Sequence, residues 1–95
     1  MKRICAFLFI LVLGLSLSGC YYSSAQNQIK TSQGLLSDLQ ARGGEKLAPY
    51  EYASAEAFLD SAQREFSQND YASAKRLADH ARASAEQGLA KVPKK

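Results

Sequence analysis

The residues best suited to covalent chemistry lie at the end of an apolar run near the N-terminus. Residues 4–17 are almost entirely apolar, and the run closes on Leu17-Ser18-Gly19-Cys20. A cysteine thiolate is a strong nucleophile, and the small residues Ser18 and Gly19 leave the peptide bond before Cys20 accessible to a protease. A nucleophile and a cleavable bond therefore stand together at the point where the apolar run stops.

This tetrapeptide resembles the lipobox of bacterial lipoproteins, which has a leucine, small residues and then the cysteine. The resemblance implies that the Cys20 thiolate takes a diacylglyceryl group from a membrane phospholipid. It also implies that a signal peptidase then cuts between Gly19 and Cys20, and that in many Gram-negative bacteria the new amine receives a further acyl chain such as palmitate. The alternatives are an uncleaved anchor and an ordinary signal peptide with an unrelated cysteine.

A short leader precedes Cys20. Lys2 and Arg3 give it a positive start. Its apolar segment, residues 4–17, is shorter than the about 20 residues that a transmembrane helix needs. A positive start, a short apolar centre and a small-residue exit are typical of a secretory signal, so residues 1–19 are predicted to be a signal peptide. Two or three acyl chains on Cys20 would hold the mature chain on a membrane without spanning it.

Tyr21 and Tyr22 follow the cysteine directly. In Gram-negative lipoproteins an Asp at the first of these positions usually causes retention in the inner membrane. The resemblance therefore implies the periplasmic face of the outer membrane, whereas in a Gram-positive host it would imply the outside of the plasma membrane. The two tyrosines either rest at the lipid headgroups, since a phenol is apolar with a polar tip, or begin the apolar stripe of the first helix.

Loss of the leader changes the charge and the cysteine content. The 95 residues include 12 basic and 9 acidic residues, and two of the basic ones, Lys2 and Arg3, leave with residues 1–19. The remaining 76 residues are nearly neutral, which gives no argument for a nucleic-acid partner. Cys5 also leaves and Cys20 would carry lipid, so we expect no disulfide.

The mature part lacks the residue sets on which catalysis and metal binding depend. His80 is the single histidine; we expect it on a solvated helix face, without a cysteine partner for a metal or a nucleophile pair. We therefore expect no enzyme, no metal and no cofactor. A row of acidic residues on the second helix is interpreted as a solvated face. These residues are Glu51, Glu56, Asp60 and Glu65.

Apolar residues at spacings of three and four predict an all-α, three-helix arrangement. The first helix, over residues 22–41, is expected to be weak and to fray toward the lipid. Ser32 interrupts its stripe, and Gly34 lowers its helix propensity by about 1 kcal/mol. The two glycines that follow Arg42 are expected to end this helix, and residues 45–47 to form a short link.

A helical hairpin should follow. The second helix is predicted over residues 49–67, because Pro49 suits the first helical position. The third is predicted from Tyr71, with an apolar stripe that reaches Val92, and the residue before Pro93 is expected to leave the α region. Asn69 or Asp70 can cap the third helix, and the proline at its end stops it. A turn of about three residues makes the two helices antiparallel neighbours.

The hairpin is expected to pack large residues of its first helix against alanines of its second. The expected pairs include Leu59 with Ala78 and Ala55 with Ala81. Because alanine buries little area, either the first helix or a second copy of the hairpin is expected to complete the core. The residues expected to be covered are Phe58, Leu77 and Leu89.

Two further resemblances concern this hairpin. It is similar to one tetratricopeptide repeat, whose large and small positions match Phe58, Ala62, Tyr71, Ala74 and Ala81, although Glu65 stands where that repeat prefers an aromatic residue. In such repeat proteins about three stacked units bury a continuous apolar face, and a single unit cannot bury its face alone.

The second resemblance is closer. The chain resembles a family of small alanine-rich bacterial lipoproteins whose domain has no assigned function. It rests on Ala48-Pro49-Tyr50-Glu51-Tyr52, Ala55-Glu56, Phe58-Leu59, Asp70-Tyr71 and Ala74, and covers residues 22–90. This family implies a fold and a location but no activity.

The end of the chain is basic. Lys91, Lys94 and Lys95 either compensate the helix dipole and keep the chain soluble or contact an anionic surface such as lipid headgroups or the cell wall. A small helical lipoprotein that ends in Lys95 also resembles the murein lipoprotein, whose last lysine is joined to peptidoglycan.

These features divide the chain into a signal peptide (1–19), a lipidated N-terminus with the first helix (20–47), a helical hairpin (48–92) and a basic tail (93–95). The predicted function is that of a lipid-anchored envelope protein with a structural or protein-interaction role. Its partners would be the membrane, through the acyl chains, and an envelope protein or a second copy. The alternative is binding or tethering of peptidoglycan through the basic end.

Overall fold

The computed structural model describes the backbone of residues 2–94 and the side chains of residues 3–10 and 21–94. This part of the chain contains helices and no strand, so the predicted all-α fold is confirmed. The helices are α1 (Lys2–Ala41), α2 (Gly44–Leu47), α3 (Pro49–Ser67) and α4 (Tyr71–Lys91). Within the described residues, none of these helices is both long enough and apolar enough to cross a membrane.

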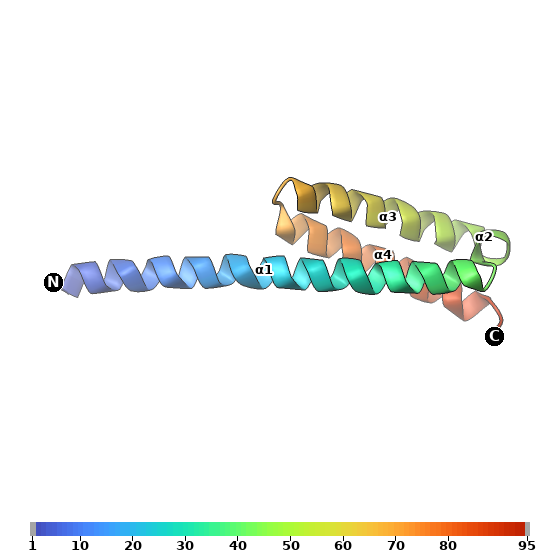
Figure 1. Ribbon diagram of the computed structural model, residues 1–95, viewed down its shortest axis with the longest axis horizontal. Helices are drawn as coiled ribbons and strands as arrows, with labels where there is room; N and C mark the ends of the chain where they lie inside the picture. Colours follow the sequence, from blue (N-terminus) through green and yellow to red (C-terminus); the bar gives the residue numbers. More distant parts are fainter. Residues whose placement is uncertain (1, 95) are drawn as a thin grey trace.

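The second half of α1 lies beside the α3–α4 hairpin and forms a three-helix bundle with it (Figure 1). The first half of α1 projects away from the bundle, and the molecule measures 65 × 23 × 14 Å as a result. Apolar side chains on this projecting part are exposed: Phe7 is 72% and Ile10 is 68% exposed. Among the described side chains, the buried ones therefore lie between Ala25 and Val92.

The start of the first helix differs from the prediction, because α1 runs without a break from Lys2 into the bundle. The first proline of the chain is Pro49, and single glycines cost a helix only about 1 kcal/mol each, so no residue before Ala41 stops it. The end at Ala41 agrees with the prediction. Gly43 then adopts a left-handed conformation (φ 82°), which closes the helix as expected.

Residues 45–47, predicted as a link, belong to the short helix α2 instead. The backbone N–H groups of Lys46 and Leu47 donate to the carbonyl oxygen of Gly43, at 3.1 and 3.0 Å. The left-handed Gly43 aims its carbonyl along the following turn, and this allows one helical turn to form before the chain enters α3.

The hairpin follows the prediction closely. Helix α3 begins at Pro49 and ends at Ser67. Asp70 caps α4 by accepting a hydrogen bond from the backbone N–H of Ser73 at 3.2 Å, while Asn69 takes the positive φ of the turn. Helix α4 ends at Lys91 and Val92 is extended, as predicted for the residue before a proline.

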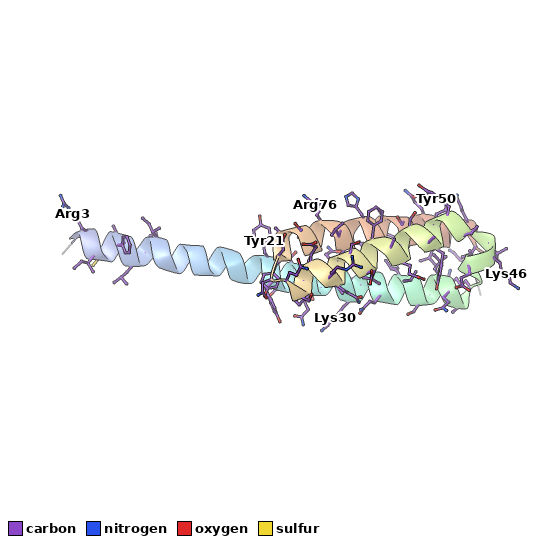
Figure 2. The ribbon with its side chains drawn as sticks, turned by 90° about the horizontal axis from the view of Figure 1, so that it is seen from above. Arg3, Tyr21, Lys30, Lys46, Tyr50 and Arg76 are labelled. Carbon is purple, nitrogen blue, oxygen red and sulfur yellow. The ribbon has the colours of Figure 1, made fainter. Side chains whose placement is uncertain are left out.

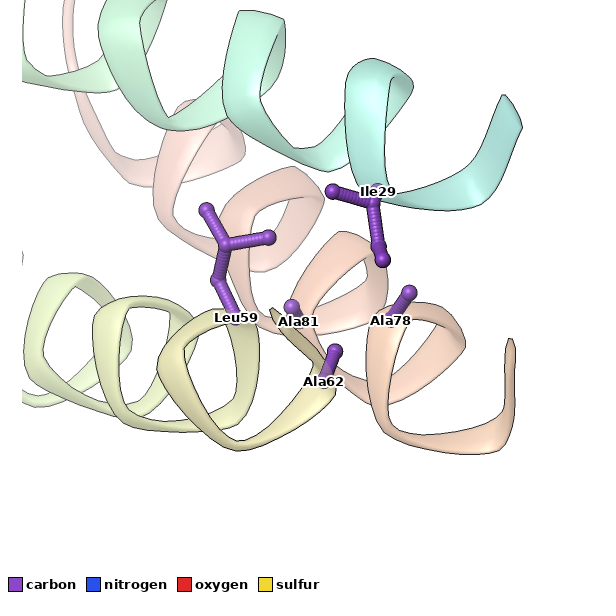
Figure 3. Close-up of a cluster of buried hydrophobic side chains, with 5 residues drawn as sticks. All are labelled: Ile29, Leu59, Ala62, Ala78 and Ala81. Carbon is purple, nitrogen blue, oxygen red and sulfur yellow. The ribbon is translucent and has the colours of Figure 1, made fainter. Parts of the chain in front are cut away.

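The buried residues of α4 repeat every three or four positions, and the described buried residues of α1 and α3 keep to one face of their helix, as the spacing predicted. In the central cluster, Ile29 of α1 points toward α3 and α4 (Figure 3). Alanine at the facing positions of α4 lets both neighbouring helices approach its backbone closely. The buried residues of the three long helices are Ala25, Ile29, Ser32 and Leu39; Glu51, Tyr52, Ala55, Leu59 and Ala62; and Ala74, Ala78, Ala81, Ala85 and Gly88.

Ser32 strengthens the contact of α1 with α4, although its place in the stripe suggested a weakness. Its side chain is buried, and its hydroxyl donates to the carbonyl oxygen of Ala78 at 2.8 Å. The small serine therefore fits the close approach of the two helices and links them directly.

Leu39 fills the core at the other end of the bundle. It is fully buried and belongs to a cluster with Ala48, Tyr52 and Val92. Leu77 and Leu89 pack against the two clusters, as expected of residues covered by the first helix. Phe58 belongs to neither cluster: it is 36% exposed, and its ring lies beside that of His80 on α4.

Candidate functional site

The two residues of the predicted processing site, Gly19 and Cys20, lie on α1 immediately before the bundle. The side chain of Cys20 falls outside the described part of the chain. The bundle begins within two turns of them, since Tyr22 contacts the hairpin and Ala25 is fully buried. An anchor at Cys20 would therefore be joined to the folded domain without a flexible spacer.

Three aromatic rings bring the helices together at this end of the bundle. The ring of Tyr22 lies 5.3 Å from that of Phe66 and 5.0 Å from that of Tyr71, and the latter two rings are 5.2 Å apart. Edge-on and tilted pairs at these separations are favourable beyond their buried area. We call this region the aromatic end. It comprises Tyr21, Tyr22, Phe66, Tyr71 and the turn at 68–70.

The two tyrosines after the cysteine thus differ in role. Tyr22 starts the apolar stripe of α1 and packs on the hairpin, although 42% of it stays exposed. Tyr21 is 50% exposed and makes none of the aromatic contacts found among the described residues. The phenol of Tyr71 donates to the side-chain oxygen of Asn69 at 2.9 Å and so supports the turn.

The opposite end of the bundle, which we call the distal end, contains an ion pair that the sequence interpretation missed. Glu51 was predicted on a solvated face, but only 8% of its side chain is exposed, and Lys91 donates a hydrogen bond to its Oε1. That bond and the lysine's charge hold the pKa of Glu51 below its usual value. Burial, with the charges of Glu45 and Glu56, raises the pKa of Tyr52 beside it.

This ion pair changes the interpretation of the basic end. Lys91 connects the end of α4 to the start of α3, so its charge is not free for an anionic surface as predicted. Lys94 is exposed, while Lys95 lies outside the described residues. Nearer the start of α4, Arg82 donates to Glu86 at 2.9 Å, and this carboxylate offsets the charge of Arg82.

His80 is exposed, as predicted, with its ring 5.2 Å from that of Phe58. In the described part of the chain, no group of His, Cys, Asp and Glu side chains has a geometry that could hold a metal ion. The same part has no pocket.

The helix register contained a signal for the missed ion pair. The hairpin places Leu59 opposite Ala78, and continuing that register brings the start of α3 to the end of α4. A Cβ atom added at Gly88 would lie 3.1 Å from the Cβ of Glu51, which shows how closely the two backbones approach. Lys91 follows one turn later on the same face.

One protein family, described as a domain of unknown function (DUF4398), matches residues 27–93. The match covers most of the chain and contains most of the bundle-forming part of α1 and the whole hairpin. No curated protein and no solved structure matches the chain.

Proposed function

The chain belongs to the DUF4398 family, and from this premise we propose that it is a lipid-anchored protein of the bacterial cell envelope. In this proposal residues 1–19 are a signal peptide, Cys20 carries the acyl chains, and the helical bundle is a structural or protein-interaction module. The single observation that carries the proposal is the Leu17-Ser18-Gly19-Cys20 motif at the end of an apolar run.

The packing of the bundle is consistent with removal of the leader. Among the described side chains of α1 (3–10 and 21–41), the buried ones all follow the motif, beginning with Ala25. The described side chains of the leader are exposed, among them Phe9 at 68% and Ile4 at 65%. A cut between Gly19 and Cys20 would therefore keep every buried side chain that the structure describes.

We further propose the periplasmic face of the outer membrane as the location, since Tyr21 stands where an Asp would favour the inner membrane. The partner would be an envelope protein or a second copy of the chain, bound at the distal end. Leu47 is 54% and Tyr50 is 77% exposed, and Figure 2 shows Tyr50 at this end of the bundle. Two large exposed apolar side chains three residues apart supply the start of an apolar patch, the kind of surface at which a partner docks. We propose no enzymatic role.

Binding of peptidoglycan is the second candidate. It is supported by Lys46 and Lys94, which are both exposed and lie at the distal end, beside the C-terminus (Figures 1 and 2). It is weakened by Lys91, whose charge is matched by Glu51. The positive surface on which a wall contact would depend is thus smaller than the sequence suggested.

The anchor is tested by the mass of the protein isolated from envelopes. We expect a chain that begins at Cys20 and carries the mass of two or three acyl chains, and an unprocessed precursor for Cys20→Ala. A bare thiol with an intact leader would refute the proposal. Cys5→Ala is the matched control and should be processed normally, because this residue lies inside the leader.

The partner is tested by crosslinking in native envelopes followed by mass spectrometry, and the wall alternative by co-sedimentation with purified peptidoglycan. Loss of sedimentation on Lys94→Glu, with unchanged melting, would favour the wall. Lys91→Glu is unsuitable for this purpose because it breaks the ion pair with Glu51 and disturbs the fold.

A further inference from the structure

We propose that the aromatic end is a contact surface for lipid headgroups, so that the bundle stands on the membrane with its long axis pointing away from it. This proposal rests on the lipid anchor at Cys20 proposed above. It adds to the anchor the surface that touches the membrane, the orientation of the domain and the height of the distal end above the lipid.

The first argument is the rigid connection between the anchor and the hairpin. Cys20 precedes Tyr22 by half a helical turn, and the ring of Tyr22 lies 5.3 Å from Phe66 of α3 and 5.0 Å from Tyr71 of α4. The start of the bundle-forming part of α1 is thereby fixed to the turn at 68–70. A membrane that holds Cys20 must therefore lie close to that turn, although 48 residues of chain separate Cys20 from Gln68.

The second argument is where the exposed apolar groups lie. After Cys20, the large hydrophobic residues found exposed in the structure are Tyr21 and Tyr22 at the aromatic end, Leu47 and Tyr50 at the distal end, and Phe58 between them. Figure 2 shows Tyr21 and Tyr50 at opposite ends of the bundle. The long sides thus offer no apolar stripe that would stabilise a bundle lying flat on lipid.

The long sides also carry exposed ion pairs. Arg64 donates to Asp60 at 2.6 Å on α3, with both side chains about two-thirds exposed, and Arg82 donates to Glu86 on α4. A flat orientation would bring such pairs into the headgroup layer and remove part of their water. An end-on orientation leaves them solvated.

The third argument is the chemistry of the aromatic end itself. Tyrosine is favoured at membrane–water interfaces, because its ring is apolar and its hydroxyl is polar. Tyr21, which makes none of the aromatic contacts of the bundle, is available for this role. Gln68 and Asn69 are uncharged, and the carboxylate of Asp70 is engaged as the cap of α4. A surface of phenols and amides suits the headgroup layer.

An upright bundle sets the height of the distal end. The 20 residues from Tyr22 to Ala41 rise about 1.5 Å each, so Leu47 and Tyr50 would stand about 30 Å above the headgroups. A partner that docks at the distal end would then be held at this distance from the lipid.

The orientation can be measured with single tryptophans, because the chain contains none. Gln68→Trp and Tyr50→Trp are prepared as lipoproteins from envelopes and placed in phosphatidylcholine vesicles that contain lipids brominated near the headgroup. We expect the tryptophan at position 68 to be quenched several-fold more strongly than the one at position 50. Tyr21→Trp is the matched control and should be quenched in any orientation, because it adjoins Cys20.

Equal quenching at positions 68 and 50 would show a bundle lying on the lipid and overturn the proposal. Quenching at position 21 alone would show a bundle that hangs free of the membrane, and would overturn it as well. Adding Tyr22→Ala to Gln68→Trp should reduce the quenching while circular dichroism stays helical, because the ring contact that fixes the turn to α1 is lost.

The mass of the same preparations separates the two proposals. Acylated protein with an unquenched position 68 would refute the orientation and leave the anchor intact. Protein without acyl chains would refute the anchor, and with it the orientation that depends on it.

Discussion

Replacement of Gly44 by alanine tests the packing of the distal end most directly. A Cβ atom at this position would lie 2.4 Å from the Cγ of Leu39, 2.7 Å from its Cδ1 and 2.8 Å from its carbonyl oxygen. Leu39 cannot retreat, since it is fully buried and its Cδ2 lies 2.8 Å from where a Cβ of Gly88 would stand. Either Leu39 leaves its site or the connection between α1 and α2 shifts.

The size of the effect follows from the cost of one extra carbon in a filled core. Such overpacking costs about 1–3 kcal/mol. In a domain of this size, that loss lowers Tm by roughly 4–24 °C. Gly34→Ala is the matched control, because a Cβ atom there meets nothing within 4 Å. It should stabilise the chain by about 0.5–1 kcal/mol through helix propensity.

The assay is thermal and urea unfolding, followed by circular dichroism. Gly44→Ala should melt below the wild type and Gly34→Ala above it. Combining Gly44→Ala with Leu39→Ala should cost less than the sum of the two single changes, since the two sites share one space. A Gly44→Ala protein that melts at or above the wild type would refute the packing described here.

Three further predictions concern the contacts between helices. Ser32→Ala should destabilise the chain by about 0.5–1.5 kcal/mol, because the hydrogen bond to Ala78 is lost, and an unchanged unfolding curve would argue against that bond. Ala78→Leu should cost about 1–3 kcal/mol by forcing α1 and α3 away from α4, and it too is checked by unfolding in urea. Glu51→Gln should lower Tm at neutral pH by removing the charge that pairs with Lys91. Because folding lowers the pKa of Glu51 from 4.5, its charge stabilises the fold above that pH, and the stabilisation is lost as the pH falls through the lower folded value. The difference in Tm between the wild type and this variant should therefore shrink below about pH 4.5, and a difference of constant size across that range would contradict the assignment.

The sequence was most informative where the determining interactions are local. The turn at 68–70, the cap at Asp70 and the bounds of α3 depend on residues within one helical turn of each other, and the prediction of each agrees with the structure. The burial pattern was equally readable, because a helix repeats every 3.6 residues whatever it packs against. The motif at Cys20 is local in the same sense, since its four residues are consecutive.

The tertiary structure alone decided the contacts between residues far apart in the chain. The sequence pattern indicated Ser32 as a weak point of the first helix, whereas in the structure its hydroxyl donates to the carbonyl oxygen of Ala78, 46 residues away. The sequence pattern placed Glu51 on a solvated face, whereas in the structure it accepts a hydrogen bond from Lys91, 40 residues away. The choice of partner at such separations depends on how far one helix slides and rotates against the next, and a periodic pattern constrains that register only in part. The spacing of apolar residues thus determined which face of each helix is buried, whereas close packing of the three helices determined which polar groups meet there.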